Sequence, residues 1–566
     1  MGAIFGLVGE GSLDEVRAMG GRMPHRGAQQ RVWSPAPGVY LGERSALAES
    51  AGGALAIDLQ SDLESPRDVA SSLRGGIGSL AGLDANFSLA WWDERAHALL
   101  LAADPSGYKS LYCAQLPGRL VFASEYKALL AFDELPAALD RDSAQAYLAK
   151  RSFRMGFPLL AGVRALTPGT RMLYREGQLE SERYWSPLSR PVQRSAAEYA
   201  RMIRERLCEV VARQARKFSQ VGMTLSAGLD SASLVAVLRH VRPEVPIHSF
   251  TIGHGEDDAE ILGGRELAAA FETRHRELFF DPACVPALLP KLVWLMEECS
   301  GREESLLQHL VLAEAGRTGQ QVVMGAYAAD SLFAGMPRHK LLRMRELFPW
   351  LSTPLTEVFQ LTQCGAEPRS LLGRAGKGIL FGRRWFPPPQ VAGATAPVEA
   401  PDPGSLDQYL ADGMLEAYDS SYLEPTLEAA GVEFRDPFQS LAMMDLALSI
   451  PARFNVTLRR QKGLLRDALA DLLPESIRTR KKSIQRVRHD GKLSEVLDAM
   501  ADELLGPETL RARGIVDPAY LEALRRRAPG APYATERIYR LWTLLCLELW
   551  SRQFLDQRGL PAGFAP

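Results

Sequence analysis

The chain has 566 residues, of which 46% are hydrophobic and 24% are charged, and its 66 Lys and Arg residues nearly balance its 68 Asp and Glu residues. The resulting formal net charge of −2 gives no overall positive charge of the kind that indicates a nucleic-acid-binding protein. The length is too great for one hydrophobic core, so we expect two or three domains.

The ends and the cysteines of the chain predict a cytoplasmic protein. The first residues, MGAIFGLVGEGS, lack the basic region and long apolar core of a signal peptide. Gly6 stands where a myristoylation signal needs Ser or Thr. No apolar stretch approaches the ~20 residues of a membrane span. The six cysteines form no C-x-x-C pair, which favours buried thiols in a reducing compartment over disulfides or zinc. We therefore expect neither membrane nor nucleic acid as a partner.

The first 190 or so residues favour a layered, β-rich domain. Short runs such as FSLAWWDE, HALLLAAD, LYCAQ and RLVFAS are apolar or alternate, and Asp, Gly and Pro separate them. The segments TPGT and REGQ read as hairpin turns. LSRPVQRS follows as a linker, so we place the first domain at residues 1–190.

From residue 195 to residue 566 the pattern predicts a parallel α/β domain. Helical spacing over 197–218 is followed by the strand VGMTLS, a helix over 231–241, the strand IHSFTIG and a helix over 258–271. LLQHLVLAEAGRTG then leads into the strand QQVVMG. Such alternation predicts a parallel sheet with its ligand at the carboxyl ends of the strands. A Pro-rich insertion at about 375–405 is expected to be a long loop or partly disordered, and the remainder is mostly helical.

The stretch SAGLDSASL, Ser226 to Leu234, predicts a phosphate site. It has neither the Lys of a Walker A loop nor the three glycines of a dinucleotide fingerprint. Small residues at a strand-to-helix turn nevertheless offer backbone N–H groups and the positive end of a helix to an anion. Asp230 would repel phosphate unless a cation lies between them, which indicates Mg²⁺. The competing interpretation is an ordinary β-α turn.

Several motifs in the same order as in a known family make the chain resemble the asparagine synthetase superfamily over nearly its whole length. SAGLDS resembles the pyrophosphate loop of that family, and VVMGAYAADSLFAG resembles its second nucleotide segment. GVEFRDPF, LPESIRTRKKS, MPHRG, AADPSGYKSLY, RLVFASEYKALL and PGTRMLYREGQLESERYW match further segments. The resemblance implies an Ntn-hydrolase-like (glutaminase-like) β-rich sandwich, followed by an adenine nucleotide α hydrolase-like (PP-loop ATP pyrophosphatase) α/β synthetase domain.

The resemblance breaks in the glutaminase part. Glutamine-using members carry Cys directly after the initiator Met, where its thiol is the nucleophile and its own amine the base. This chain has Gly2 there, and the region AGGALAIDLQSD replaces the Asn-Gly-Glu segment that grips glutamine. Ammonia is therefore not expected to be made, and the first domain reads as a relic scaffold or as a surface for a partner.

By resemblance, the C-terminal domain binds ATP and Mg²⁺. Asp230 and Asp330 are placed to hold Mg²⁺, although either alone would more often be a helix cap. Thr224 and Ile252 would flank the adenine. Together, the nucleotide-binding residues are Thr224, Ser226, Gly228, Asp230, Ser231, Ile252 and Gly325.

Three further residues carry the chemistry that the resemblance implies. Lys482 matches the lysine that stabilises charge on the departing groups, with Lys481 as its rival and a solvated basic run as the plain alternative. Tyr327 replaces the Glu of the ammonia-using motif and stands where β-lactam-forming relatives carry a Tyr that acts as a general base with an acidic partner. Asp419 has the spacing of that partner, while Glu416 and Glu424 are rivals. Tyr327 could instead be a packed aromatic residue.

The sequence thus favours an ATP-dependent lasso peptide cyclase, a macrolactam synthetase. By resemblance, its partners are a core peptide as substrate and the leader peptidase and leader-recognition protein of the same pathway. A small-molecule cyclase of the β-lactam or carbapenam synthetase type and an ammonia-dependent asparagine synthetase are the alternatives. A degenerate regulatory protein is disfavoured because SAGLDS, Asp330 and Lys482 are intact.

Overall fold

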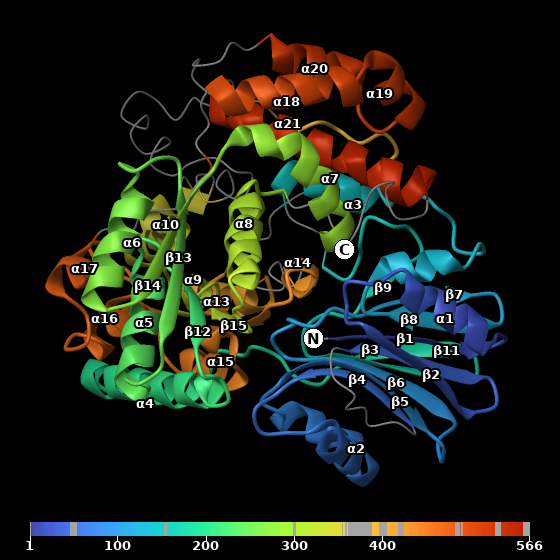
Figure 1. Ribbon diagram of the computed structural model, residues 1–566, viewed down its shortest axis with the longest axis horizontal. Coiled ribbons are helices and arrows are strands. Elements are labelled where there is room, and N and C mark those ends of the chain that lie inside the picture. Colours follow the sequence, from blue (N-terminus) through green and yellow to red (C-terminus); the bar gives the residue numbers. More distant parts are fainter. Residues whose placement is uncertain are drawn as a thin grey trace.

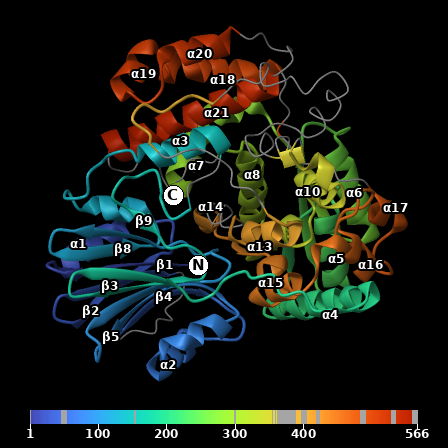
Figure 2. The ribbon, with the colours of Figure 1, turned by 180° about the vertical axis from the view of Figure 1, so that it is seen from behind.

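The computed structural model describes residues 2–45, 54–151, 155–297, 301–353, 355–356, 359, 388–395, 404–416, 424–480, 487, 491–526 and 534–557. Figure 1 shows a β-rich N-terminal domain (blue to cyan) beside a C-terminal domain built around a second type of sheet, and Figure 2 shows the same arrangement from behind.

The N-terminal domain is a sandwich of two antiparallel sheets. One sheet has six strands in the order β2 (Gln29–Ala36), β3 (Val39–Ser45), β1 (Gly2–Gly9), β8 (Arg119–Ala123), β7 (Tyr112–Leu116) and β9 (Arg164–Ala165). The other has five in the order β11 (Gln178–Arg183), β10 (Thr170–Arg175), β6 (Ala98–Ala103), β5 (Asn86–Asp93) and β4 (Leu55–Gln60). Side chains from both sheets, such as Ile4, Phe122 and Leu101, form one buried core between them.

Helices cover the outer faces of this sandwich. Helix α1 (Leu13–Gly21) packs on the six-stranded sheet, and α2 (Pro66–Gly75) packs on the five-stranded one. Helix α3 (Arg141–Lys150) lies against the C-terminal helices. The predicted layered β-rich domain is confirmed. One detail is wrong: TPGT is a turn before β10 but joins no hairpin, because β9 pairs with β7 and β10 pairs with β6 and β11.

The C-terminal domain contains the predicted parallel sheet. Its five strands lie in the order β14 (Arg274–Phe279), β13 (Ile247–Gly253), β12 (Val221–Thr224), β15 (Val322–Met324) and β16 (Glu433–Arg435), and all neighbours run parallel. The sequence patterns missed both edge strands. β14 alternates exposed and half-buried polar residues, and β16 has only three residues.

Helices surround this sheet and continue beyond it. The helices that follow the linker are α4 (Ala196–Ala215), α5 (Leu229–Val241), α6 (Ala259–Ala270), α7 (Val285–Met296), α8 (Glu304–Arg317), α9 (Ala329–Leu332) and α10 (Pro337–Leu347). After these come α13 (Leu406–Glu416), α14 (Glu424–Ala429), α15 (Leu441–Leu448), α16 (Gly463–Ala468) and α17 (Glu475–Thr479). The last group is α18 (Gly491–Leu504), α19 (Pro507–Arg513), α20 (Pro518–Arg525) and α21 (Ala534–Trp550), of which α21 packs on α3 and α7 (Figure 1).

Two sequence expectations about the C-terminal domain can be compared with the structure only in part. Of the Pro-rich insertion, residues 388–395 are loop and are fixed to α3, since Val391 N donates to Gln145 Oε1 at 2.7 Å and Arg141 Nη1 donates to Ala392 O at 2.6 Å. The rest of the insertion up to residue 403 lies outside the described residues. Among the described residues, none of the helices is long and apolar enough to cross a membrane.

Candidate active site

The predicted nucleotide residues gather at the carboxyl edge of the parallel sheet. Thr224 ends β12, Ile252 lies one residue before the end of β13, and Gly325 directly follows β15. Gly325 has to be small, because a Cβ there would lie 2.6 Å from the Phe434 ring and 3.3 Å from Thr224 Oγ1. The three residues therefore lie where loops of neighbouring strands meet, which is the usual ligand position in such sheets.

The SAGLDS loop is held in shape by its own side chains. Ser226 N donates to Ser231 Oγ at 3.1 Å, and Gly228 N donates to Ser226 Oγ at 3.2 Å. Ala227 N donates to Glu260 Oε2 at 2.8 Å. These three amides thus already have acceptors within the protein, contrary to the expectation that the loop offers exposed N–H groups. An anion would instead meet the N-terminal turn of α5, which begins directly after Gly228.

Asp230 and Asp330 face one another across a single lysine that the sequence interpretation missed. Lys462 Nζ forms ion pairs with both carboxylates. The Lys462 side chain is only 5% exposed, whereas those of Asp230 and Asp330 are 21% and 25% exposed. Burial by itself would lower the pKa of Lys462, but the two carboxylates outweigh it and raise that pKa above its usual value. Lys462 therefore keeps its positive charge between them.

The backbone at Lys462 is adapted to this contact. Lys462 precedes α16 with a φ of 53°, in the left-handed region that non-glycine residues seldom adopt. Gly335 makes room for it, because a Cβ there would collide with the Asp330 carboxylate and with Lys462 Cε. Nothing in the run RRQKGLLR distinguishes Lys462 from its neighbours, since its partners lie 232 and 132 residues away along the chain.

The two aspartates are suited to hold a divalent cation. The structure already stabilises a positive charge between their oxygens, and carboxylate oxygens are the ligands that Mg²⁺ prefers. Both carboxylates retain access to solvent, so an ion and a phosphate could reach them. The structure thus brings Asp230 and Asp330 together, and metal binding by them stays a prediction.

Tyr327 lies in the turn between β15 and α9, three residues before Asp330. Its ring is half-buried and packs against Phe434, with the ring centres 5.2 Å apart and an angle of 39° between the planes. The turn is capped by Asp436, whose Oδ2 accepts from Ala328 N at 2.9 Å. Burial raises the pKa of Asp436 to about 7. Tyr327 is therefore both a packing residue and a neighbour of the aspartate site, and a catalytic role stays a prediction.

For the other predicted catalytic residues, the structure describes only the neighbouring segments. Lys482, its rival Lys481 and Asp419 lie outside the described residues, and α13 ends at Glu416. Arg480 ties the segment that leads to Lys482 onto the SAGLDS loop, because its guanidinium donates to Ala227 O at 3.2 Å and pairs with Glu266. Glu424, which the sequence offers as an alternative to Asp419, is buried and pairs with Lys109 of the N-terminal domain.

Residue 2, where the resemblance places a glutaminase nucleophile, is closed in this chain. A Cβ on Gly2 would lie 2.9 Å from Arg44 O and 3.3 Å from Asp58 Oδ1. The Gly2 amide donates to Glu428 Oε1 of the C-terminal domain at 3.2 Å. A side chain at residue 2 would therefore require the backbone around Arg44 O to shift. The described N-terminal domain therefore offers no glutaminase chemistry at this position.

Comparison with known proteins gives two family matches. The model of the asparagine synthase family, described as "Asparagine synthase", matches residues 202–552. That of the "Glutamine amidotransferase domain" matches residues 60–185. The two matches lie in the same order as the two domains of the structure.

Individual relatives have low sequence identity to this chain but align with most of its length. Asparagine synthetase [glutamine-hydrolyzing] 3 of Bacillus subtilis (strain 168) is 23% identical over 418 residues, which cover 71% of this chain and 67% of that protein. A putative asparagine synthetase [glutamine-hydrolyzing] of Mycobacterium tuberculosis (strain ATCC 25618 / H37Rv) is 27% identical over 531 residues, 86% of this chain and 79% of that protein. A solved glutamine phosphoribosylpyrophosphate amidotransferase from B. subtilis overlaps 49% of this chain and 65% of its own, at 14% identity and a TM-score of 0.23. That overlap is too low to support an argument.

Proposed function

The chain belongs to the asparagine synthase family, whose members are ATP-dependent amide-forming ligases, and we propose that it is a lasso peptide cyclase. A carboxylate oxygen of an Asp or Glu side chain in a core peptide attacks the α-phosphorus of ATP, so that acyl-adenylate forms and pyrophosphate leaves. The N-terminal amine of the same peptide then attacks the acyl carbon. An isopeptide macrolactam forms, AMP leaves and the amine loses its proton.

The observation that carries the proposal is the closure around Gly2. With Arg44 O, Asp58 and Glu428 in contact with this strand, the N-terminal domain has no room for the cysteine that releases ammonia from glutamine. The C-terminal domain nevertheless keeps Asp230 and Asp330, with Lys462 between them. An enzyme that activates a carboxylate without its own ammonia supply needs another amine, and a ring-closing enzyme takes that amine from its substrate.

The roles proposed for the site follow from its charges. Mg²⁺ held by Asp230 and Asp330 would neutralise part of the triphosphate charge. Lys462 supplies a further cation at the same place, and Lys482 is proposed to stabilise the departing groups. Ser226, Gly228 and Ser231 shape the turn that leads into α5. Tyr327, with Asp419 as its acidic partner, is proposed to take the proton from the attacking amine.

The cellular setting is part of the same proposal. The core peptide would reach the enzyme through a leader-recognition protein and a leader peptidase of the same pathway. Six cysteines without a C-x-x-C pair support work in the reducing cytoplasm.

The direct test incubates the purified protein with ATP, Mg²⁺ and the peptide encoded next to its gene, with the leader removed. We expect the peptide to lose the mass of one water while AMP and pyrophosphate appear in equal amounts. Adding glutamine should change neither rate, and no glutamate should form. Production of ADP and phosphate, or of free asparagine from aspartate and ammonia, would contradict the proposal.

A small-molecule cyclase of the β-lactam synthetase type is the second candidate. Tyr327 favours it, because a tyrosine in this turn is what the resemblance associates with such enzymes. The same assay separates the two candidates, since a carboxyethylated amino acid and not a peptide would then be cyclised. An ammonia-dependent asparagine synthetase is the third, and it predicts asparagine formation on addition of ammonium.

A further inference from the structure

Strand β16 of the C-terminal domain is held by the N-terminal domain. Gln60 Nε2 donates to Phe434 O at 3.0 Å, and Asp62 Oδ2 accepts from Arg435 Nη1 at 2.6 Å. The Asp62 and Arg435 side chains are 7% and 3% exposed, so this ion pair is shielded from solvent. Gln60 and Asp62 belong to the stretch 51–62, which stands where the glutamine-gripping segment is missing. In this chain the same stretch binds strand β16 of the C-terminal domain.

The same strand holds the turn that carries Tyr327. Phe434 packs against the Tyr327 ring, and Gly325 N donates to Arg435 O at 3.0 Å. Asp436, directly after β16, caps Ala328 N at 2.9 Å, and its carboxylate also interacts with the Tyr327 backbone. Three successive residues of one strand and its end thus fix the path from Gly325 to Ala328, which leads into the helix with Asp330.

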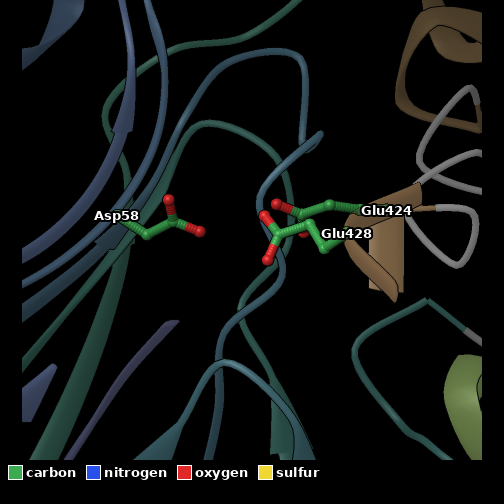
Figure 3. Close-up of side chains that lie close together, drawn as sticks. All are labelled: Asp58, Glu424 and Glu428. Atoms are coloured by element: carbon green, nitrogen blue, oxygen red, sulfur yellow. The ribbon is translucent and has the colours of Figure 1, made fainter. Parts of the chain in front are cut away.

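A second hold acts just before β16 in the sequence. Glu424 and Glu428 of α14 point toward Asp58 of the N-terminal domain (Figure 3). Lys109 Nζ lies 3.0 Å from Asp58 Oδ2 and 3.5 Å from Glu428 Oε1, and it pairs with Glu424. Arg26 Nη1 lies 3.2 Å from Glu424 and 3.3 Å from Glu428.

This cluster joins the domains, and its buried carboxylates are already paired with Lys109 and Arg26. The carboxylates of Asp58, Glu424 and Glu428 lie close enough together to hold a cation. The ammonium of Lys109 already lies among them, however, and both it and the carboxylates are buried. The segment from Glu424 to Asp436 is therefore tied to the N-terminal domain at both ends.

We propose that the N-terminal domain positions the site for amide formation: Gln60 and Asp62 hold β16, and β16 holds the Tyr327 turn. These two residues touch no reacting atom, so they are positioning residues. A displacement of about 1 Å in a reacting group can slow a reaction about 100-fold, so a shift of this turn should be visible in the rate. The inference depends on the proposed function only for its kinetic readout.

The test compares two matched variants. Asp62→Asn removes the charge that faces Arg435. The control, Asp84→Asn, removes the charge of another ion pair between the domains, in which Asp84 Oδ2 lies 2.6 Å from Arg213 Nη2 on α4. Both are Asp–Arg pairs of the same length. The Asp84 pair is more exposed, at 20% and 16%, and Asp84 also accepts from Leu441 N at the start of α15, whereas Asp62 contacts β16 itself, whose residues hold the Tyr327 turn. Asp62→Glu tests rescue. Gln60→Glu tests the second contact, because it keeps the side-chain size, removes the donor to Phe434 O and places a carboxylate beside Glu433, whose Oε1 lies 3.5 Å from Gln60 Nε2.

We expect Asp62→Asn and Gln60→Glu to lower kcat for ring closure by about tenfold or more, with KM for ATP changed less than about threefold. Asp84→Asn should change kcat by less than about twofold, and Asp62→Glu should recover most of the rate. Independently of activity, hydrogen exchange of the amides over residues 325–328 should speed up in Asp62→Asn and in Gln60→Glu, but not in Asp84→Asn.

The outcomes separate this inference from the proposed function. Equal losses of kcat in Asp62→Asn and Asp84→Asn, or unchanged exchange over 325–328 in the two positioning variants, would overturn it. If the parent protein cyclises no peptide, the proposed function fails, and hydrogen exchange still decides the positioning role. If Asp62→Asn does not fold, Gln60→Glu carries the same comparison with Asp84→Asn.

Discussion

Replacing Lys462 by Met tests the charge balance of the aspartate site. Met keeps the unbranched stem as far as Cε and lacks the ammonium, so Asp230 and Asp330 are left facing one another. Removing one partner of a fully buried ion pair costs about 3–5 kcal/mol. Because these carboxylates are 21% and 25% exposed, water relieves part of the repulsion, and we expect about 3 kcal/mol, at the lower end of that range.

Added Mg²⁺ distinguishes this cause from simple loss of packing. In the variant, Mg²⁺ can occupy the place of the ammonium between the two carboxylates. A ligand at 100 times its dissociation constant stabilises a protein by about 2.7 kcal/mol, so most of the loss should be regained. The parent should gain less, because Lys462 competes for the same oxygens. Adenylation should still fall by about 100-fold to 1,000-fold, since one preorganised cation is missing.

Urea unfolding with EDTA and with Mg²⁺, together with pyrophosphate exchange, measures these effects. Arg460→Met is the matched control, because Arg460 lies two residues before Lys462 and pairs with Asp467 at the surface, where the two side chains are 42% and 46% exposed. It should cost less than about 1 kcal/mol and leave adenylation unchanged. If Lys462→Met is as stable as the parent, or gains no more from Mg²⁺, the account of the site as a cation-holding pair is refuted.

Three further predictions follow from the same structure. Gly2→Cys should not gain glutaminase activity and should lower the stability, because a Cβ there lies 2.9 Å from Arg44 O; glutamate release from glutamine by this variant would contradict the closure of the position. Tyr327→Phe should keep acyl-adenylate formation, trapped with hydroxylamine, and slow ring closure by about 10²–10⁴-fold; equal rates of ring closure in variant and parent would make Tyr327 a packing residue only. Burial and the nearby carboxylates of Asp58 and Glu428 raise the pKa of Glu424 from the ordinary value of 4.5 to about 7. The neutral form of Glu424 therefore stabilises the folded protein. This contribution is complete below pH 4.5 and is lost as the pH rises through 7. Relative to Glu424→Gln, which stays neutral, the parent should therefore lose about 1–3 kcal/mol of unfolding free energy between pH 5 and pH 8 in urea titrations, and parallel curves for the two proteins would show that Glu424 is ionised throughout.

Local patterns determined much of the fold. The strands FSLAWWDE, HALLLAAD and IHSFTIG and the helix over 197–218 carry their own periodicity, and the structure confirms them as β5, β6, β13 and α4. Ser195 and Glu198 form the capping box that begins α4, so residues close together in the sequence also determine where this helix starts. The loss of the nucleophile at Gly2 is likewise visible in the sequence alone, because glycine has no side chain that could act as one.

The sequence by itself did not determine which distant charges meet. Lys462 looks like one cation in a basic run. Only the fold, in which α16 packs on α4, places this lysine, directly before α16, between Asp230 and Asp330. β14 was missed because an edge strand is exposed on alternate positions and lacks the apolar run of a central one. β16 was missed because three residues carry no period. Its neighbouring strand β15 lies more than 100 residues before it, and the contacts with Gln60 and Asp62 span 374 and 373 residues. Periodicity indicates the type of an element and which of its faces is buried. Ion pairs and edge pairings, in contrast, depend on elements that meet only when the chain is folded.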